Sequence, residues 1–107
     1  RGTFPWGSED ESLLAFFRRL GQLRAERISM QCGIIRYLHA QGGGLVVERL
    51  HGTERTVTAL NAGDTPLELT LPWDGRLCID AVTGQQFLSQ NGTVRLTLPP
   101  LDGVILV

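Results

Sequence analysis

Apolar residues near the start of the chain recur at helical spacing. Ser8 and Glu11 form a capping box ahead of this run, and Glu9 and Asp10 add negative charge where a helix dipole favours it. The pattern predicts a helix over residues 9–27. Its apolar stripe covers about half the circumference, which suits a helix between two neighbours. We therefore expect it to fold back on the rest of the chain or to pack against a second copy. The stripe consists of Leu13, Leu14, Phe16, Phe17, Leu20 and Leu23.

From Ile28 onward the apolar period changes to two, which is typical of half-buried strands. The clearest examples are the segments 67–71 and 93–98, where Leu and Val alternate with polar residues. In the segment 76–81 we expect Leu77, Ile79 and Ala81 to face the core, with Cys78 and Asp80 on the other face. Gly, Asn, Asp and Pro residues break the pattern every 8–12 residues or so, as hairpin turns require. The predicted strands span residues 33–40, 44–50, 55–61, 66–71, 76–81, 85–89, 93–98 and 103–107.

The fold class follows from this order of elements. No helical pattern returns after about residue 28, and short strands without intervening helices indicate an antiparallel sandwich or barrel. We predict a mainly β fold, an antiparallel Greek-key β-sandwich of seven or eight strands preceded by one N-terminal amphipathic α-helix. The 107 residues are enough for one domain, or for one domain with a fragment of its neighbour. Arg at position 1 in place of Met is expected of a segment taken from a longer polypeptide.

Composition excludes several classes of partner. The net charge is −1, all ten basic side chains are Arg, and no basic stripe stands out, so a nucleic-acid surface is not expected. No apolar run approaches the roughly 20 residues of a membrane span. No Cys or His has metal-ligand spacing, so neither a metal nor a cofactor is expected. One or both of Cys32 and Cys78 are interpreted as small buried hydrophobes, and whether they pair stays open.

Catalytic groups are scarce. His39 and His51 lie near predicted strand ends, with Gly close by, and are interpreted as surface loop histidines. No Ser has a nucleophile-elbow setting or a plausible His partner. Four Asp residues in the predicted β region could include a carboxylate pair for acid–base chemistry, but turn structure accounts for three of them better, and Asp80 is expected to face solvent. These residues are Asp64, Asp74, Asp80 and Asp102.

The two tryptophans offer an alternative. An exposed Trp6 or Trp73 could stack on the apolar face of a sugar ring, which would make the domain a carbohydrate-binding module. The preferred interpretation is structural: Trp6 packs at the base of the helix and Trp73 covers a hydrophobic edge.

The order of motifs along the whole chain resembles the end of an α-amylase superfamily enzyme, glycoside hydrolase family 13. The start at Arg1 with Phe4-Pro5-Trp6 is similar to a stretch late in the family's catalytic barrel, and the Leu- and Arg-rich helix is similar to the segment that follows it. The linker 30–33, the strand ending at Asn61, the Asp-x-x-Thr-Gly turn at 80–84 and the ending 98–106 match in the same order. Within the family, the chain most resembles the neopullulanase, cyclomaltodextrinase and maltogenic-amylase enzymes.

This resemblance implies a division of the chain. Residues 1–28 would be the end of the catalytic barrel with its last helix, and residues 29–107 the C-terminal antiparallel β-sandwich. The catalytic carboxylates of the family lie upstream, so the fragment is expected to hold no catalytic residue and to be inactive alone. Its expected role is to stabilise the barrel of an α-glucan-active, retaining enzyme. Arg1, Trp6 and Trp73 are the candidate substrate-binding residues.

The resemblance also sets the expected partners. They are the parent's own catalytic barrel and, through the parent, an α-glucan; no nucleic acid or membrane is expected. An oligomerisation module remains an alternative, and it predicts an exposed apolar patch of several hundred Å². The host is expected to be a bacterium, and cytoplasmic and secreted locations both stay open.

Overall fold

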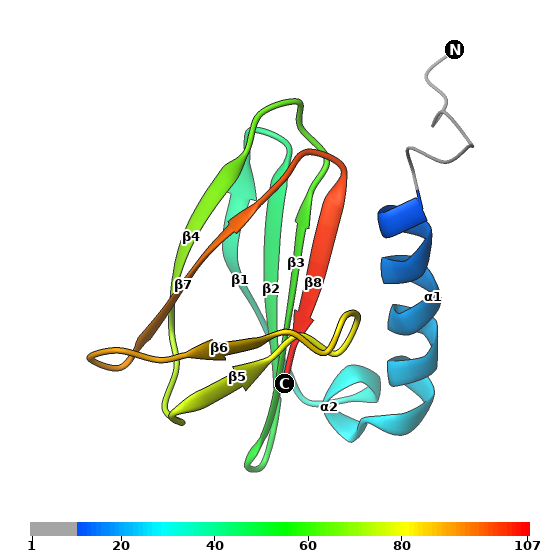
Figure 1. Cartoon of the computed structure of the whole chain (residues 1–107). Helices are drawn as coiled ribbons and strands as arrows, with labels where there is room; N and C mark the ends of the chain where they lie inside the picture. Colours follow the sequence, from blue (N-terminus) through cyan, green and yellow to red (C-terminus); the bar gives the residue numbers. More distant parts are fainter. Residues whose placement is uncertain (1–10) are drawn as a thin grey trace.

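A computed structural model describes residues 11–107, and in these residues the helix and the strands form three layers (Figure 1). Helix α1 (Glu11–Glu26) lies along one face of a four-stranded sheet, and the short helix α2 (Ile28–Gln31) joins it to that sheet. The sheet has the order β1-β2-β3-β8. Its strands are β1 (Ile34–Gln41), β2 (Gly44–His51), β3 (Glu54–Asn61) and β8 (Asp102–Leu106).

Two strand pairs form the second layer of the sandwich. β4 (Leu67–Pro72) pairs with β7 (Thr93–Leu98), and β5 (Leu77–Ile79) pairs with β6 (Gln86–Leu88). Every strand pair is antiparallel. The chain leaves the first sheet after β3, forms β4 to β7, and returns as β8 to pair with β3. The β3–β4 and β7–β8 connections thus link two strands that are paired in one layer to two that are paired in the other, as in Greek-key sandwiches.

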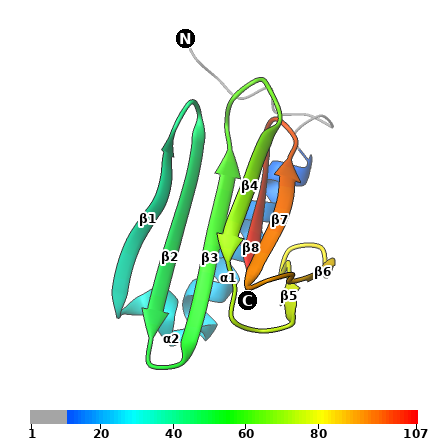
Figure 2. The same cartoon turned by 90° about the vertical axis from the view of Figure 1, so that its left-hand side faces the viewer.

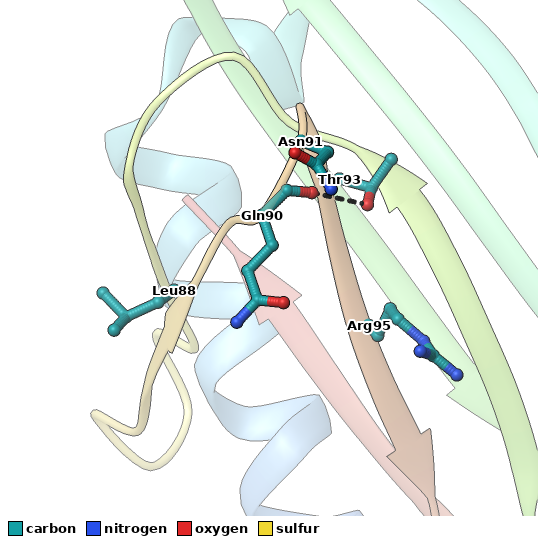
Figure 3. A pocket seen from close by; sticks show the side chains of 5 residues that line it. All are labelled: Leu88, Gln90, Asn91, Thr93 and Arg95. Carbon is teal, nitrogen blue, oxygen red and sulfur yellow. Dashed lines mark hydrogen bonds between the residues drawn. The ribbon is translucent and has the colours of Figure 1, made fainter.

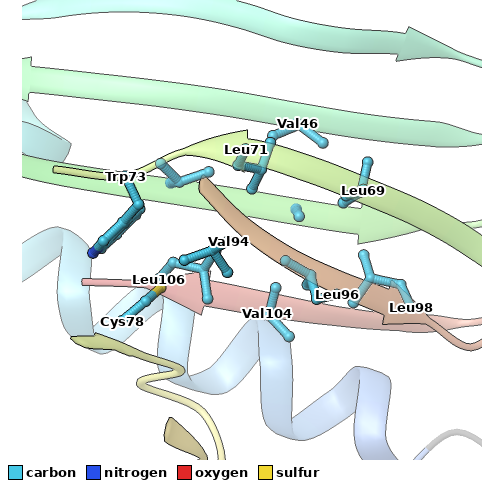
Figure 4. Close-up of a cluster of buried hydrophobic side chains, with 12 residues drawn as sticks. Val46, Leu69, Leu71, Trp73, Cys78, Val94, Leu96, Leu98, Val104 and Leu106 are labelled. Carbon is cyan, nitrogen blue, oxygen red and sulfur yellow. The ribbon is translucent and has the colours of Figure 1, made fainter. Parts of the chain in front are cut away.

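The core lies between the two strand layers (Figure 4). Inward-facing side chains of β2, β3 and β8 meet those of β4 and β7, and this burial of apolar surface is the main force that holds the layers together. Cys78 and Trp73 fill the end of the core near β5. The labelled members in Figure 4 are Val46, Leu69, Leu71, Trp73, Cys78, Val94, Leu96, Leu98, Val104 and Leu106.

Asn61 at the end of β3 fastens the loops at one end of the sandwich. Its side chain is 2% exposed, and its Nδ2 donates to the carbonyl oxygens of Thr65 at 2.8 Å and Leu98 at 3.0 Å. Its Oδ1 accepts a hydrogen bond from the Gly63 amide at 3.0 Å. A buried amide satisfied in this way fixes the β3–β4 and β7–β8 connections relative to each other.

The predicted antiparallel β-sandwich behind one amphipathic helix is confirmed. The strands that the alternation predicts over 67–71 and 93–98 match β4 and β7 closely, and their apolar faces are buried as expected. The described part of the first helix ends at Glu26, and the capping residue Ser8 lies outside the described residues. The structure adds α2, a single turn that the sequence pattern did not indicate.

The expected orientation of the segment 76–81 is wrong. Leu77 is 41% exposed, whereas Cys78 is fully buried and Asp80 is 2% exposed. Hydrogen bonds decide this orientation. The Asp80 carboxylate accepts from the amides of Val82 at 2.9 Å and Ile105 at 3.2 Å, and from the Thr83 hydroxyl at 3.0 Å. A buried carboxylate is stabilised by such donors, so Asp80 joins the β5–β6 turn to β8 and does not face solvent.

Candidate docking interface

Helix α1 is attached to the sandwich through a second, smaller core. Leu13, Phe16 and Leu23 pack against Ile105 of β8, and Phe16 is 1% exposed. The Phe16 ring lies over Gly103, where an added Cβ would come within 2.6 Å of the ring. Gly103 is therefore the position that lets the helix approach β8 closely. The expectation that this helix folds back on the sandwich is confirmed.

Polar contacts hold the other end of α1 and the start of α2. Arg27 donates through Nε to the Thr56 hydroxyl at 2.7 Å and through Nη2 to the Arg55 carbonyl at 3.0 Å. The Ser29 hydroxyl lies 2.9 Å from the Thr56 hydroxyl in a buried contact. The Ser29 amide donates to Glu54 Oε2 at 2.6 Å. The helix is thus fixed to β3 at its C-terminal end as well as to β8 along its length.

Glu54 makes this attachment sensitive to acid. Hydrogen bonds from Ser29, with a smaller contribution from the charge of Arg27, hold the pKa of the Glu54 carboxyl below its usual value. A carboxyl whose pKa is lower in the folded state stabilises the fold above its unfolded pKa. The Glu54 contribution is therefore present at neutral pH and is lost as the pH falls through the folded pKa.

Gly33 lies where the chain turns from α2 into β1. Its φ is +114°, a value that side chains with a Cβ rarely adopt, and an added Cβ would collide with the Leu50 carbonyl oxygen. The turn brings β1 against β2 immediately after α2. The sharp joint between helix and sandwich depends on this glycine.

The side of α1 next to β1 and β2 leaves apolar surface uncovered. Phe17 is 46% exposed and Leu14 is 37% exposed on the helix, and Tyr37 is 66% and Ile35 49% exposed on β1. Between the helix and the sheet lies an open groove of about 210 Å³, whose lining includes Leu20, Ile35, Tyr37, Leu45 and Val47. We call this surface, from Leu14 and Phe17 across the groove to Ile35, Tyr37 and Leu45, the docking face.

The β1–β2 hairpin extends past the second layer of the sandwich (Figure 2). β1 pairs with β2 alone among the described strands, so one of its edges carries free backbone groups. Ile34 is 67% exposed at the start of this strand. An exposed edge with large apolar residues is a surface that normally has a neighbour.

Trp73 lies inside the sandwich and does not form a flat platform. It is 7% exposed, and its indole N–H donates to the Leu77 carbonyl at 3.1 Å. The Arg55 guanidinium lies 4.8 Å from the centre of its ring. This agrees with the preferred interpretation of a Trp that covers a hydrophobic edge. A sugar contact by Trp73 stays a prediction, and Arg1 and Trp6 lie outside the described residues.

The other candidates do not come together at a site. His51 is exposed at the end of β2, and His39 is half-buried within β1, not in a loop. Asp64 and Asp74 lie in exposed bends, and Asp102 accepts a hydrogen bond from the next amide, that of Gly103, at 2.8 Å. Within residues 11–107 no group of three or more His, Cys, Asp or Glu residues could hold a metal ion.

A polar depression lies beside the β6–β7 turn, on the second layer of the sandwich (Figure 3). The volume of this depression is about 400 Å³. Within its lining, the Thr93 hydroxyl donates a hydrogen bond to the Gln90 carbonyl at 3.0 Å. Arg95 is the one charged residue of its lining among residues 11–107. A single guanidinium beside amides and a hydroxyl provides no acid–base pair. Its lining consists of Leu88, Gln90, Asn91, Thr93 and Arg95.

The two cysteines are expected to differ sharply in reactivity. Cys78 is buried, and burial raises the pKa of its thiol to about 11, whereas Cys32 is exposed. Because the thiolate is the reactive species, Ellman's reagent at pH 8 should modify one thiol per folded chain and two per unfolded chain. The Cys32→Ser variant is the control and should be inert until it is unfolded. Rapid reaction of this variant in the folded state would contradict the burial of Cys78.

Comparison with other proteins shows which enzymes this chain is similar to. No protein-family model matches the chain. The amylopullulanase of Thermoanaerobacter thermohydrosulfuricus is 28% identical over 122 aligned residues, which cover the whole chain and 8% of that protein. A solved debranching enzyme of Nostoc punctiforme is 26% identical, with a TM-score of 0.59 over 83% of this chain and 18% of its own. This chain is similar to the C-terminal region of α-amylase-family enzymes.

The solved Anoxybacillus α-amylase has a segment with the same fold as this chain. Its TM-score is 0.76 at 24% identity, over 97% of this chain and 23% of the amylase. The chain spans a tenth or less of the curated relatives it matches. The narrower resemblance to neopullulanase-like enzymes stays a prediction. Among residues 11–107 no helix is long and apolar enough to cross a membrane.

Proposed function

We propose that this chain is the non-catalytic C-terminal part of an α-glucan-active glycoside hydrolase, and that it stabilises the catalytic barrel. On this proposal residues 1–28 are the end of that barrel with its last helix, and residues 29–107 are the C-terminal sandwich. The parent is a retaining enzyme whose carboxylates lie upstream. The relatives support this assignment because they bear the names of α-glucan-active enzymes and are about ten times longer than the matched segment.

The docking face is the observation that supports the proposal most directly. α1 buries one stripe of side chains against β8 and leaves Leu14 and Phe17 open on another side. A helix with two apolar sides is typical of one wedged between two bodies. Because Arg27 and Ser29 bind the end of α1 to Thr56 of β3, a body bound to the docking face would be supported by the helix and the sandwich together.

The test is a substitution on the docking face in the full-length polypeptide that carries this chain. Phe17→Ser should lower the stability of the full-length protein by about 1–2 kcal/mol, because burial of the exposed part of this ring would be lost. The measurement is the midpoint of heat inactivation with an α-glucan substrate. Leu88→Ser is the matched control: this residue is 73% exposed on the second layer, and its substitution should leave the midpoint unchanged.

Other outcomes separate the alternatives. The chain of 107 residues alone should not hydrolyse maltoheptaose, and measurable hydrolysis would contradict the non-catalytic assignment. If Phe17→Ser has no more effect than Leu88→Ser, the docking face does not support the barrel. A chain that dimerises in light scattering through the docking face, both alone and in the full-length protein, would favour the oligomerisation module instead.

A further inference from the structure

Gly21 stands in the interior of α1 without a reason inside the described structure. An added Cβ would meet no atom of residues 11–107 within 4 Å, and the position is exposed among them. Glycine in a helix interior is destabilising relative to alanine, because it loses more backbone freedom on folding. Gly33 and Gly103, by contrast, are each explained by a neighbour that a Cβ would strike. The backbone at Gly21 is bare towards solvent.

The position of Gly21 on the helix relates it to the docking face. Gly21 lies four residues after Phe17 and seven after Leu14, a spacing that places all three on one side of a helix. Ala25, four residues further on, is also exposed and small. Two large apolar residues are thus followed by two small ones along the same side. A body that contacts Phe17 and Leu14 would come closest to the helix axis at Gly21.

Two arginines flank this side of the helix. Arg18 and Arg24 are exposed, and no described side chain forms an ion pair or hydrogen bond with either. Arg24 also contributes to the lining of the groove. The bare helix backbone is therefore bordered by positive charge, and a complementary surface would carry carboxylates or carbonyl oxygens.

The charges argue against a second copy as the occupant. A two-fold pairing of α1 helices centred on Gly21 would place Arg18 of one copy beside Arg24 of the other, twice. Like charges placed opposite each other at an interface are costly. A different surface does not have this conflict. The curated relatives are about ten times longer than the part they share with this chain, so such a surface is available within one polypeptide.

We propose that the upstream part of the same polypeptide approaches α1 most closely at Gly21, main chain against main chain, with carboxylates placed towards Arg18 and Arg24. This inference rests on the proposed function and adds the point and the chemistry of contact. Gly21 then serves the same purpose towards the barrel that Gly103 serves towards the helix. Both glycines remove a Cβ where two bodies meet.

The test compares the same substitutions in two settings. In the chain of 107 residues alone, Gly21→Ala should raise the unfolding midpoint by about 4 °C and Gly21→Leu should not lower it, because both residues favour the helix and the site is open. In the full-length protein, Gly21→Leu should shorten the half-life of activity at elevated temperature roughly fivefold, because the side chain holds the two bodies apart. The reversal of sign between the two settings is the expected result.

Ala15→Leu is the matched control. Ala15 is exposed and lies about 120° around α1 from Gly21, away from the docking face, so its substitution should be harmless in both settings. The inference is wrong if Gly21→Leu is tolerated in the full-length protein while Phe17→Ser destabilises it, and the proposed function then stands. If both are tolerated, the proposed function fails as well. If Gly21→Leu destabilises the chain alone, or dissociates a dimer of it, the upstream part is not the occupant.

Discussion

Phe16→Ala is expected to lower the free energy of unfolding of this chain by about 3–5 kcal/mol, whereas Phe17→Ala, one residue away, should cost less than about 1 kcal/mol. Phe16 is 1% exposed in the contact between α1 and β8, and Phe17 is 46% exposed. Removing the buried ring loses its burial and leaves a cavity over Gly103. Urea unfolding followed by circular dichroism measures the free energy of unfolding of both variants. Phe17→Ala is the control, because it makes the same substitution on the same helix.

This comparison also shows whether the helix and the sandwich unfold together. Phe16 joins α1 to Ile105, and Arg19 donates through Nε to the Ala81 carbonyl at 2.9 Å on the same side of the helix. A single cooperative transition that moves to lower urea in Phe16→Ala is expected. Equal effects of the two substitutions, or a separate early transition of the helix in the unmodified chain, would contradict this account of the attachment.

Glu48→Ala is the second substitution with a large expected effect, about 3–5 kcal/mol of lost stability. The Glu48 side chain is 3% exposed between two arginines of the neighbouring strands. Its Oε1 lies 2.7 Å from Nη2 of Arg36, and its Oε2 accepts a hydrogen bond from Nε of Arg55. Arg55 in turn lies over Trp73 and donates through Nη1 to the Pro72 carbonyl at 2.9 Å. Without the carboxylate, the charge of Arg55 loses its partner at the edge of the core.

Glu68→Ala is the matched control, because Glu68 lies exposed on β4 and forms no ion pair among residues 11–107. Its effect should lie within about 0.5 kcal/mol of zero. The Glu48→Gln variant keeps the volume and should recover part of the loss. If Glu48→Ala is no more costly than Glu68→Ala in urea unfolding at neutral pH, the network of Glu48 and the two arginines does not stabilise the fold.

Periodicity was sufficient to predict most of the elements. The alternation of Leu67, Leu69 and Leu71 and that of Val94 and Leu96 is repeated in the burial of β4 and β7, since each has one face on the core and one in solvent. Turns could be located because Gly and Asn tolerate positive φ, as at Asn91 with φ +55°. The broad apolar stripe of the first helix predicted contacts on two sides, and one of these is present in α1 and β8.

Periodicity failed where a long-range hydrogen bond decides the orientation. Asp80 is inward because amides of the next turn and of β8 surround its carboxylate, and nothing in its own segment reveals the amide of Ile105, 25 residues away. The burial of Glu48 has the same character, because its partners Arg36 and Arg55 come from two other strands. From the sequence pattern alone, a charged residue such as Glu48 in a strand is assigned to the solvent face.

The glycines of the docking region carry a signal that was present in the sequence but had no context there. Gly33, Gly103 and Gly21 look alike as letters, and only the neighbours of each backbone distinguish them. At Gly33 the backbone has a positive φ, and at Gly103 a Cβ would strike the Phe16 ring. At Gly21 neither reason is present among the described residues. The docking face was missed for a related reason: its side chains come from α1, β1 and β2, which are brought together by the fold.

The attachment of α1 along its length and at its C-terminal end has a consequence for protein engineering. A foreign domain fused directly ahead of this helix would be held at one angle to the strands, because at the junction Arg27 and Ser29 bind the end of the helix to Thr56 of β3. Loosening that junction with an inserted spacer would restore freedom of orientation but would disconnect the two bodies mechanically. The segment is therefore suited to join two domains at a defined orientation, because the position of α1 is fixed by the strands on which it packs.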